Sequence, residues 1–161
     1  MMTILLVDVA EADVAILASA LRVEGFEVTL AKSASEAREV LASRPVALTI
    51  LDLMLRCEGG ANGLELAREL RTDYPSMRVL LTSSYHLSER QLERADCGVS
   101  GFIPKPYDVR EVVDFVRAKV SSPPSSRRLW CAERPSGIAP RRAHLDADLD
   151  AVADEVAAHR R

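Results

Sequence analysis

Apolar residues within positions 1–120 follow two spacings that alternate along the chain. Short unbroken apolar runs are typical of strands buried on both faces, and they occur at 3–7, 46–51, 79–81 and 101–103. Apolar and polar residues alternate over 26–30, which predicts one further strand with Phe26, Val28 and Leu30 on its apolar side. Between these runs, apolar residues recur every three or four positions. The pattern therefore predicts a helix in each interval and one after the last strand.

Capping and breaking residues support these helices. Serine or aspartate precedes a glutamate or glutamine by three positions at Ser33–Glu36, Ser88–Gln91 and Asp108–Glu111, as at helix N-termini. The third helix is expected from Gly63 to Asp73 and the fourth from about Ser88 to Asp96. Five strands alternating with five helices predict an α/β fold, a doubly wound, five-stranded parallel sheet of the flavodoxin-like type.

The remaining chain has a different pattern. Residues 121–142 are rich in proline, serine and arginine and predict a linker, so that the first domain is expected to span 1–120. Residues 143–161 predict a short amphipathic helix, with an apolar stripe formed by Leu145, Leu149, Val152 and Val156. Because so short a helix is marginal in water by itself, we expect it to dock on its own domain, a second copy or a partner.

Composition excludes several classes of protein. The chain has 161 residues and a formal net charge of −3, which argues against a surface that grips DNA as a whole. Three cysteines without paired spacing exclude a disulfide framework or a zinc site as the organising principle, and a cytoplasmic location is expected. No apolar run is long enough for a membrane span, and the N-terminus lacks the features of a signal peptide.

Chemically active residues follow four of the five predicted strands. Asp8 follows the first strand, Asp52 the third, Thr82 the fourth and Lys105 the fifth. Each one alone has an ordinary explanation, since aspartate after a strand most often forms a turn or caps a helix. The carboxyl ends of parallel strands meet at one edge, however, where sheets of this kind bind ligands. The joint occurrence therefore predicts a site with two carboxylates, a hydroxyl and an ammonium group.

This set of groups suits phosphoryl transfer to a carboxylate. Paired aspartates offer the oxygen ligands that Mg²⁺ prefers, and the cation offsets the charge of an incoming phosphoryl group. A lysine ammonium and a threonine hydroxyl can bind the phosphoryl oxygens.

The segments ILLVD (4–8), LTILDLML (48–55), GLEL (63–66), VLLTSS (79–84) and GFIPKPYD (101–108) together resemble the receiver domain of response regulators in two-component signalling. The resemblance implies that Asp52 is the phosphoacceptor, with Thr82 and Lys105 as its catalytic partners and Thr82 and Phe102 as switch residues. It also implies Mg²⁺ binding by Asp8, Asp52 and the backbone carbonyl of Met54, and a Lys105–Pro106 bond that is often cis.

Two departures from the family pattern stand out. Val9 occupies the place of the usual second acid, so Mg²⁺ is expected to bind weakly; Glu11 could compensate through water or simply be a first-turn acid. The stretch 57–62 after Asp52 is longer than usual, and Arg56 there could reach a phosphate or lie in solvent.

The resemblance implies a stand-alone receiver that is phosphorylated on Asp52 by a sensor histidine kinase or a phosphotransfer protein. It is expected to signal to a downstream protein through the face formed by the fourth helix, the fifth strand and the fifth helix, with Phe102 on it, and a homodimer is possible. A DNA-binding output domain, a membrane anchor and turnover of an external substrate are not expected. The alternative is a phosphorylation-independent adaptor. A flavin mononucleotide protein of similar fold is disfavoured because the acidic loop after the first strand would repel phosphate.

Overall fold

The computed structural model describes residues 1–57, 59, 62–84, 90 and 99–123. They form a five-stranded sheet in the order β2-β1-β3-β4-β5, in which every neighbouring pair is parallel. The strands are β1 (Thr3–Val7), β2 (Glu27–Ala31), β3 (Leu48–Asp52), β4 (Arg78–Ser83) and β5 (Gly101–Pro104). The prediction of a doubly wound parallel sheet is confirmed.

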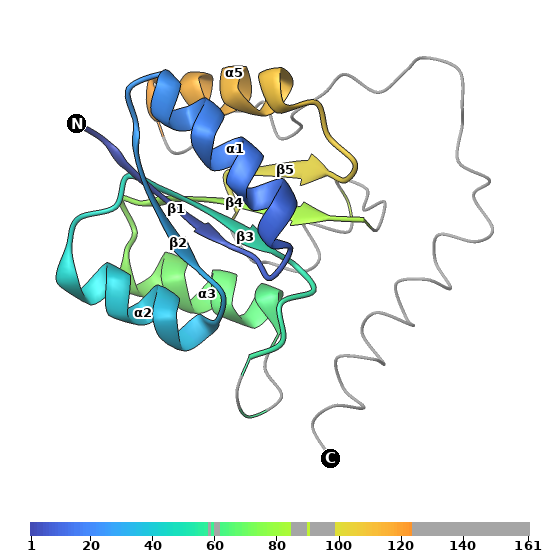
Figure 1. Cartoon of the computed structure of the whole chain (residues 1–161). Helices are drawn as coiled ribbons and strands as arrows, with labels where there is room; N and C mark the ends of the chain where they lie inside the picture. The colour runs from blue at the N-terminus through green and yellow to red at the C-terminus, as the bar shows by residue number, and fades with distance from the viewer. Residues whose placement is uncertain (58, 60–61, 85–89, 91–98, 124–161) are drawn as a thin grey trace.

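Four helices lie in the described part of the chain: α1 (Glu11–Val23), α2 (Ala34–Ser43), α3 (Gly63–Asp73) and α5 (Val109–Val120). Figure 1 shows α1 and α5 on one face of the sheet and α2 and α3 on the other. The helix predicted from Ser88 to Asp96, most of the predicted linker and the predicted helix at 143–161 lie outside the described residues. None of the described helices has both the length and the apolar character needed to cross a bilayer.

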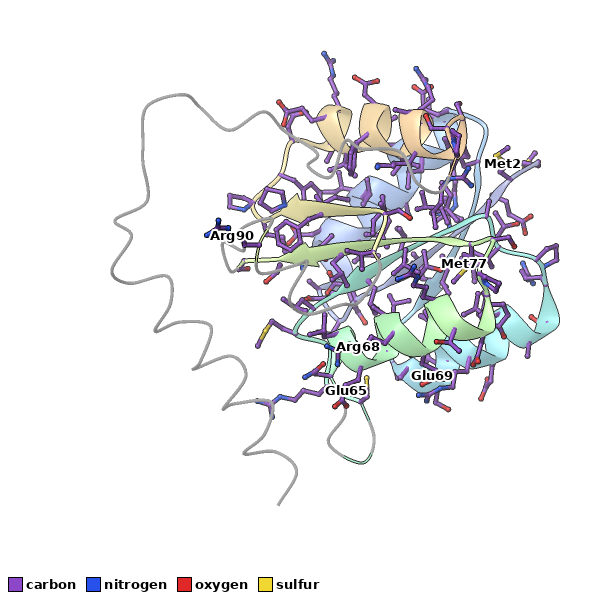
Figure 2. All side chains as sticks on the ribbon, turned by 180° about the vertical axis from the view of Figure 1, so that it is seen from behind. Met2, Glu65, Arg68, Glu69, Met77 and Arg90 are labelled. Atoms are coloured by element: carbon purple, nitrogen blue, oxygen red, sulfur yellow. The ribbon has the colours of Figure 1, made fainter. Side chains whose placement is uncertain are left out.

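Two apolar cores flank the sheet. Side chains of β1, β3 and β4 point alternately to either face, so Leu5 and Leu51 pack against α2 and α3, whereas Ile4 and Ile50 pack against α1 and α5. Burial on both faces explains why the sequences of these strands are almost entirely apolar. The sticks in Figure 2 fill the space between the sheet and both helix layers.

The helix caps follow the sequence signals. The Ser33 hydroxyl accepts a hydrogen bond from the Glu36 amide at 3.1 Å, and the Asp108 carboxylate accepts from the amides of Arg110 and Glu111. Leu30, predicted to lie on the apolar side of β2 with Val28, is 44% exposed, whereas Ala31 is buried in the core on the α2–α3 side. β2 is an edge strand with a neighbouring strand on one side only, so its side chains have fewer residues around them than those of the inner strands.

Candidate functional site

Four strands bring the predicted site residues to one edge of the sheet. Asp8 comes directly after β1, Asp52 is the last residue of β3, and Lys105 comes directly after β5. Thr82, near the end of β4, is the register partner of Asp52. Because all five strands run in the same direction, these positions share the carboxyl edge.

Lys105 lies between the two aspartates. Its Nζ atom is 2.7 Å from Asp8 Oδ2 and 3.1 Å from Asp52 Oδ2. The side chains are mostly enclosed, with exposed fractions of 16% for Lys105, 10% for Asp8 and 14% for Asp52. We call these three residues the acidic cluster. It carries two negative charges and one positive charge in a partly desolvated place.

The second oxygen of each aspartate holds the local backbone. Asp8 Oδ1 accepts a hydrogen bond from the Ala10 amide at 2.9 Å, and Asp52 Oδ1 accepts one from the Met54 amide at 2.8 Å. Both bonds reach two residues ahead, as in an Asx turn. In each aspartate, therefore, one oxygen forms the turn that is common after a strand, and the other oxygen contacts Lys105.

The pKa of Lys105 reflects opposing effects. Burial by itself would lower this pKa, but the hydrogen bond to Asp8 and the negative charge of Asp52 outweigh burial and raise it above the ordinary lysine value. Lys105 is therefore held as an ammonium ion beside the carboxylates. Tyr107, two residues further on, is half-buried, and burial raises the pKa of its phenol.

The other predicted site residues differ in exposure. Thr82 is buried, and its carbonyl oxygen accepts the Leu53 amide at 2.8 Å, which ties the end of β4 to the turn after Asp52. Phe102 is fully buried within the core on the α2–α3 side. Met54 and Val9, each close in sequence to one of the aspartates, expose large apolar side chains to solvent.

The structure shows the surroundings of three further features that the sequence analysis discussed. Glu11 forms an exposed ion pair with Lys32, so its carboxylate has a partner on the surface. Arg56 is exposed, and its backbone forms an antiparallel bridge with Asn62, which closes the longer loop at its base. The Lys105–Pro106 bond is cis.

Asn62 and Gly63 were not identified as important to the site from the sequence. The Asn62 side chain caps α3 by accepting hydrogen bonds from the amides of Leu64 and Glu65. Gly63 lies so close to the end of β3 that a Cβ atom there would be 2.2 Å from the Asp52 carbonyl oxygen. An asparagine directly before a predicted helix is the one sequence signal that could have revealed the cap.

The donor atoms of the acidic cluster fit Mg²⁺. In proteins this ion is usually held by one or two carboxylates, with water and substrate oxygens completing the shell. Asp8 and Asp52 supply two carboxylates beside the same lysine. Within the described residues, however, no group of three acidic, histidine or cysteine side chains is placed to hold a metal ion. The cluster thus supplies two carboxylates for such an ion, and Val9 adds no oxygen ligand.

Comparisons with known proteins agree on one family. The family described as "Response regulator receiver domain" matches residues 4–117. The photosynthetic apparatus regulatory protein RegA of Cereibacter sphaeroides is 32% identical over 133 residues, which cover 82% of this chain and 71% of RegA. A response regulator from Thermotoga maritima has a TM-score of 0.67 and 26% identity, over 76% of this chain and 99% of that one.

A receiver domain protein described as CheY-like, from Methanospirillum hungatei, has a similar fold. Its TM-score is 0.67, with 24% identity over 75% of this chain and 94% of that one. Other curated relatives are longer: the chain spans 38% of the protein PetR from Rhodobacter capsulatus.

Proposed function

The chain belongs to the response-regulator receiver family of two-component signalling, and on this premise we propose that Asp52 accepts a phosphoryl group from a sensor histidine kinase or a phosphotransfer protein. The family consists of signalling modules and not of enzymes that turn over an external substrate. One observation carries the proposal: the Lys105 ammonium is within 3.1 Å of a carboxylate oxygen of both Asp52 and Asp8. The same edge holds the hydroxyl-bearing Thr82 as the register partner of Asp52.

The proposed step is a displacement at phosphorus. A carboxylate oxygen of Asp52 forms a bond to phosphorus while the bond from phosphorus to the donor's imidazole nitrogen breaks, which leaves an acyl phosphate on Asp52 and a neutral imidazole after proton uptake. Lys105 remains positively charged and pairs with a phosphoryl oxygen. The Thr82 hydroxyl donates a hydrogen bond to another phosphoryl oxygen.

Asp8, Asp52 and the backbone carbonyl of Met54 would hold Mg²⁺ in this proposal. When bound, the ion offsets the negative charge that gathers on the phosphoryl oxygens. Val9 supplies no oxygen ligand and is 65% exposed, so we expect weak binding.

The proposed output is a contact with a downstream protein. Phosphorylation changes the partners of Thr82 and Lys105, which lie near the end of β4 and directly after β5. Phe102 lies on β5 and is fully buried, so a shift of either loop alters its packing. We propose that the surface around β5 and α5 transmits this change.

Intact-mass spectrometry tests the proposal. The full chain is incubated with Mg²⁺ and acetyl phosphate and compared with an Asp52→Asn variant. We expect the wild type to gain the mass of one phosphate and the variant to gain none. A gain that persists in Asp52→Asn, or no gain even with candidate kinases, would contradict Asp52 as the acceptor.

A second candidate function is a phosphorylation-independent adaptor. The observation that favours it is Val9, which leaves the cluster with two acids. Val9→Asp restores the third acid and separates the two candidates. Tighter Mg²⁺ binding by calorimetry and faster phosphorylation in this variant support a weakened but functional receiver. Unchanged Mg²⁺ affinity would show that the account of the metal ligands is wrong.

A further inference from the structure

The outer face of α1 is apolar or uncharged along its length. Val14, Leu17, Ala18 and Leu21 face the core, and the opposite side of the helix presents Ala12, Ile16, Ser19 and Val23. Ile16 is 59% exposed and Val23 is 85% exposed. Exposed helix faces normally carry charged residues, so a stripe of this kind points to an occupant. We call these four residues, Ala12, Ile16, Ser19 and Val23, the α1 stripe.

The C-terminal sequence contains a stripe with the same spacing. Leu145, Leu149, Val152 and Val156 follow one another at intervals of four, three and four residues, as do the members of the α1 stripe. This spacing places all four on one side of a helix and matches the seam of a two-helix coiled coil. A helix of this length needs a partner to be stable in water.

The chain leaves the described fold beside the C-terminal end of the α1 stripe. Arg117, in the last turn of α5, forms an ion pair with Glu24, which directly follows Val23. Both helices cover the same face of the sheet (Figure 1). A random-coil chain of roughly twenty residues spans about 25 Å on average, so a linker as long as 121–142 can return the chain to α1.

We propose that residues 143–161 dock as a helix on the α1 stripe of the same molecule, antiparallel to α1. In this orientation Leu145 lies opposite Val23 and Val152 lies opposite Ile16, so that the 4-3-4 intervals coincide. Leu149 and Val156 then face the small residues Ser19 and Ala12, which leave room for them.

Charge favours the antiparallel orientation. The acids Asp146, Asp148 and Asp150 come close to Arg22, whereas Arg160 and Arg161 come close to Glu11 and Asp13. The parallel orientation would bring the acidic ends of both helices together, which is unfavourable.

The tail is a better occupant than a second copy of the chain. A short tether gives the tail an effective concentration of about 1 mM at α1, which another molecule reaches only in very concentrated solution. Val156 of the docked tail would lie opposite Ala12, in the first turn of α1. The proposal itself does not depend on phosphorylation of Asp52.

Disulfide trapping tests the contact in the full chain. Cys57, Cys97 and Cys131 are replaced by serine, and Ser19→Cys is combined with Leu149→Cys. We expect rapid formation of an intramolecular disulfide under mild oxidation, seen as the loss of two hydrogens in the monomer mass. The matched control combines Val23→Cys with Val156→Cys, a pair that is adjacent only in the parallel orientation and should close slowly. Equal closure of both pairs, or no closure of either, overturns the proposal, and a disulfide-linked dimer overturns it in favour of a second copy.

Two further variants show whether the apolar stripe directs the contact. Ile16→Asp places a charge in the contact and should slow disulfide closure between positions 19 and 149 by about tenfold. Ala15→Asp adds the same charge to the exposed surface of α1 away from the stripe and should leave the rate nearly unchanged. Circular dichroism checks that both variants retain the fold. Equal rates in the two variants would exclude the stripe as the docking surface.

Discussion

Charged side chains have different partners at the two ends of the parallel strands, which we call the amino edge and the carboxyl edge of the sheet. At the amino edge, Glu27 accepts a bond from Arg44 at 2.9 Å and another from the Thr3 hydroxyl at 3.2 Å, and Arg78 donates to the Ser122 carbonyl. At the carboxyl edge, Asp8 and Asp52 share the cation of Lys105. The same parallel topology thus produces an amino edge where the two arginines outnumber the glutamate, and a carboxyl edge where two carboxylates outnumber the lysine.

The difference shows where chemistry can occur. At the amino edge, the Glu27 carboxylate bonds to Arg44 and to the Thr3 hydroxyl, whereas Arg78 donates to the neutral Ser122 carbonyl. At the carboxyl edge, two partly desolvated carboxylates and one ammonium group give the cluster a net negative charge, which attracts a cation. Three predictions measure how strongly each edge depends on its contacts, and a fourth sets the scale for an exposed ion pair.

The largest effect is expected for Gly63→Ala at the carboxyl edge. The new Cβ would lie 2.2 Å from the Asp52 carbonyl oxygen, and backbone atoms cannot move away without disturbing the end of β3. We expect a loss of about 3–4 kcal/mol in the free energy of unfolding, measured by urea denaturation.

The control is Gly101→Ala at the amino end of β5. There the nearest atom is Cζ of the Phe115 ring at 2.7 Å, which belongs to a side chain and not to the backbone. We expect this variant to lose clearly less stability than Gly63→Ala. The reverse order would contradict the close approach of α3 to the end of β3.

Lys105→Met should cost about 2–3 kcal/mol at neutral pH, because it leaves two partly buried carboxylates without their lysine partner. The folded-state pKa of Lys105 is raised above 10.5, so its contribution is fully present below that value and is lost only as the pH rises through the raised pKa. The difference between wild type and variant should therefore stay constant between neutral pH and the ordinary lysine pKa. High salt should reduce it. A difference that disappears within this pH range would show that Lys105 is not held as an ammonium ion.

Arg78→Met at the amino edge should cost about 1 kcal/mol or less. It removes the bond to Ser122, but it also removes a buried Nε atom that has no hydrogen-bond partner among the described residues. Denaturation at low and high salt should give the same difference from wild type. A cost as large as that of Lys105→Met would contradict the contrast between the two edges.

The smallest effect is expected for Glu69→Gln, which sets the scale for an exposed ion pair. Arg38 Nε is 2.7 Å from Glu69 Oε1, and Glu69 lies on the side of α3 that faces away from the sheet (Figure 2). The hydrogen bond from Arg38 lowers the pKa of Glu69, so the stabilisation is present above pH 4.5 and is lost as the pH falls through the lowered pKa.

Solvent screening should limit the cost of Glu69→Gln to about 0.5 kcal/mol at neutral pH, determined by thermal unfolding. Glu39→Gln on α2 is the control, since its carboxylate forms no ion pair within the described part of the chain. Equal costs in the two variants would show that the Arg38 contact contributes nothing.

Local sequence signals were sufficient for most of the fold. The apolar run at 3–7 and the helix from Gly63 to Asp73 have the predicted bounds, because continuous apolar residues need two covered faces and helical spacing needs one. The predictions were less accurate at the edge strand β2, where Leu30 follows the alternation but is 44% exposed. The burial of a side chain on an edge strand depends on which elements pack against it, and the sequence of the strand alone does not show which these are.

The candidate site could be predicted only in part from the sequence. The order of Asp8, Asp52, Thr82 and Lys105 along the chain, combined with the parallel topology, was enough to predict that they share an edge. Pairing at the level of atoms was not predictable: one oxygen of each aspartate holds a turn and the other contacts Lys105. The close approach of Gly63 to Asp52 was also not predictable, because no local sequence signal gives the distance between the two segments.

The sequence by itself therefore determined the kind of sheet, the helices that cover it and the residue types at its carboxyl edge, because these depend on hydrophobic spacing and strand direction. Only the tertiary structure decided that one ammonium group lies within bonding distance of both carboxylates, and that Ile16 and Val23 on the outer face of α1 are exposed. Electrostatic and packing contacts between distant segments depend on distances of a few ångströms, which are set when the layers pack together and not by any segment alone.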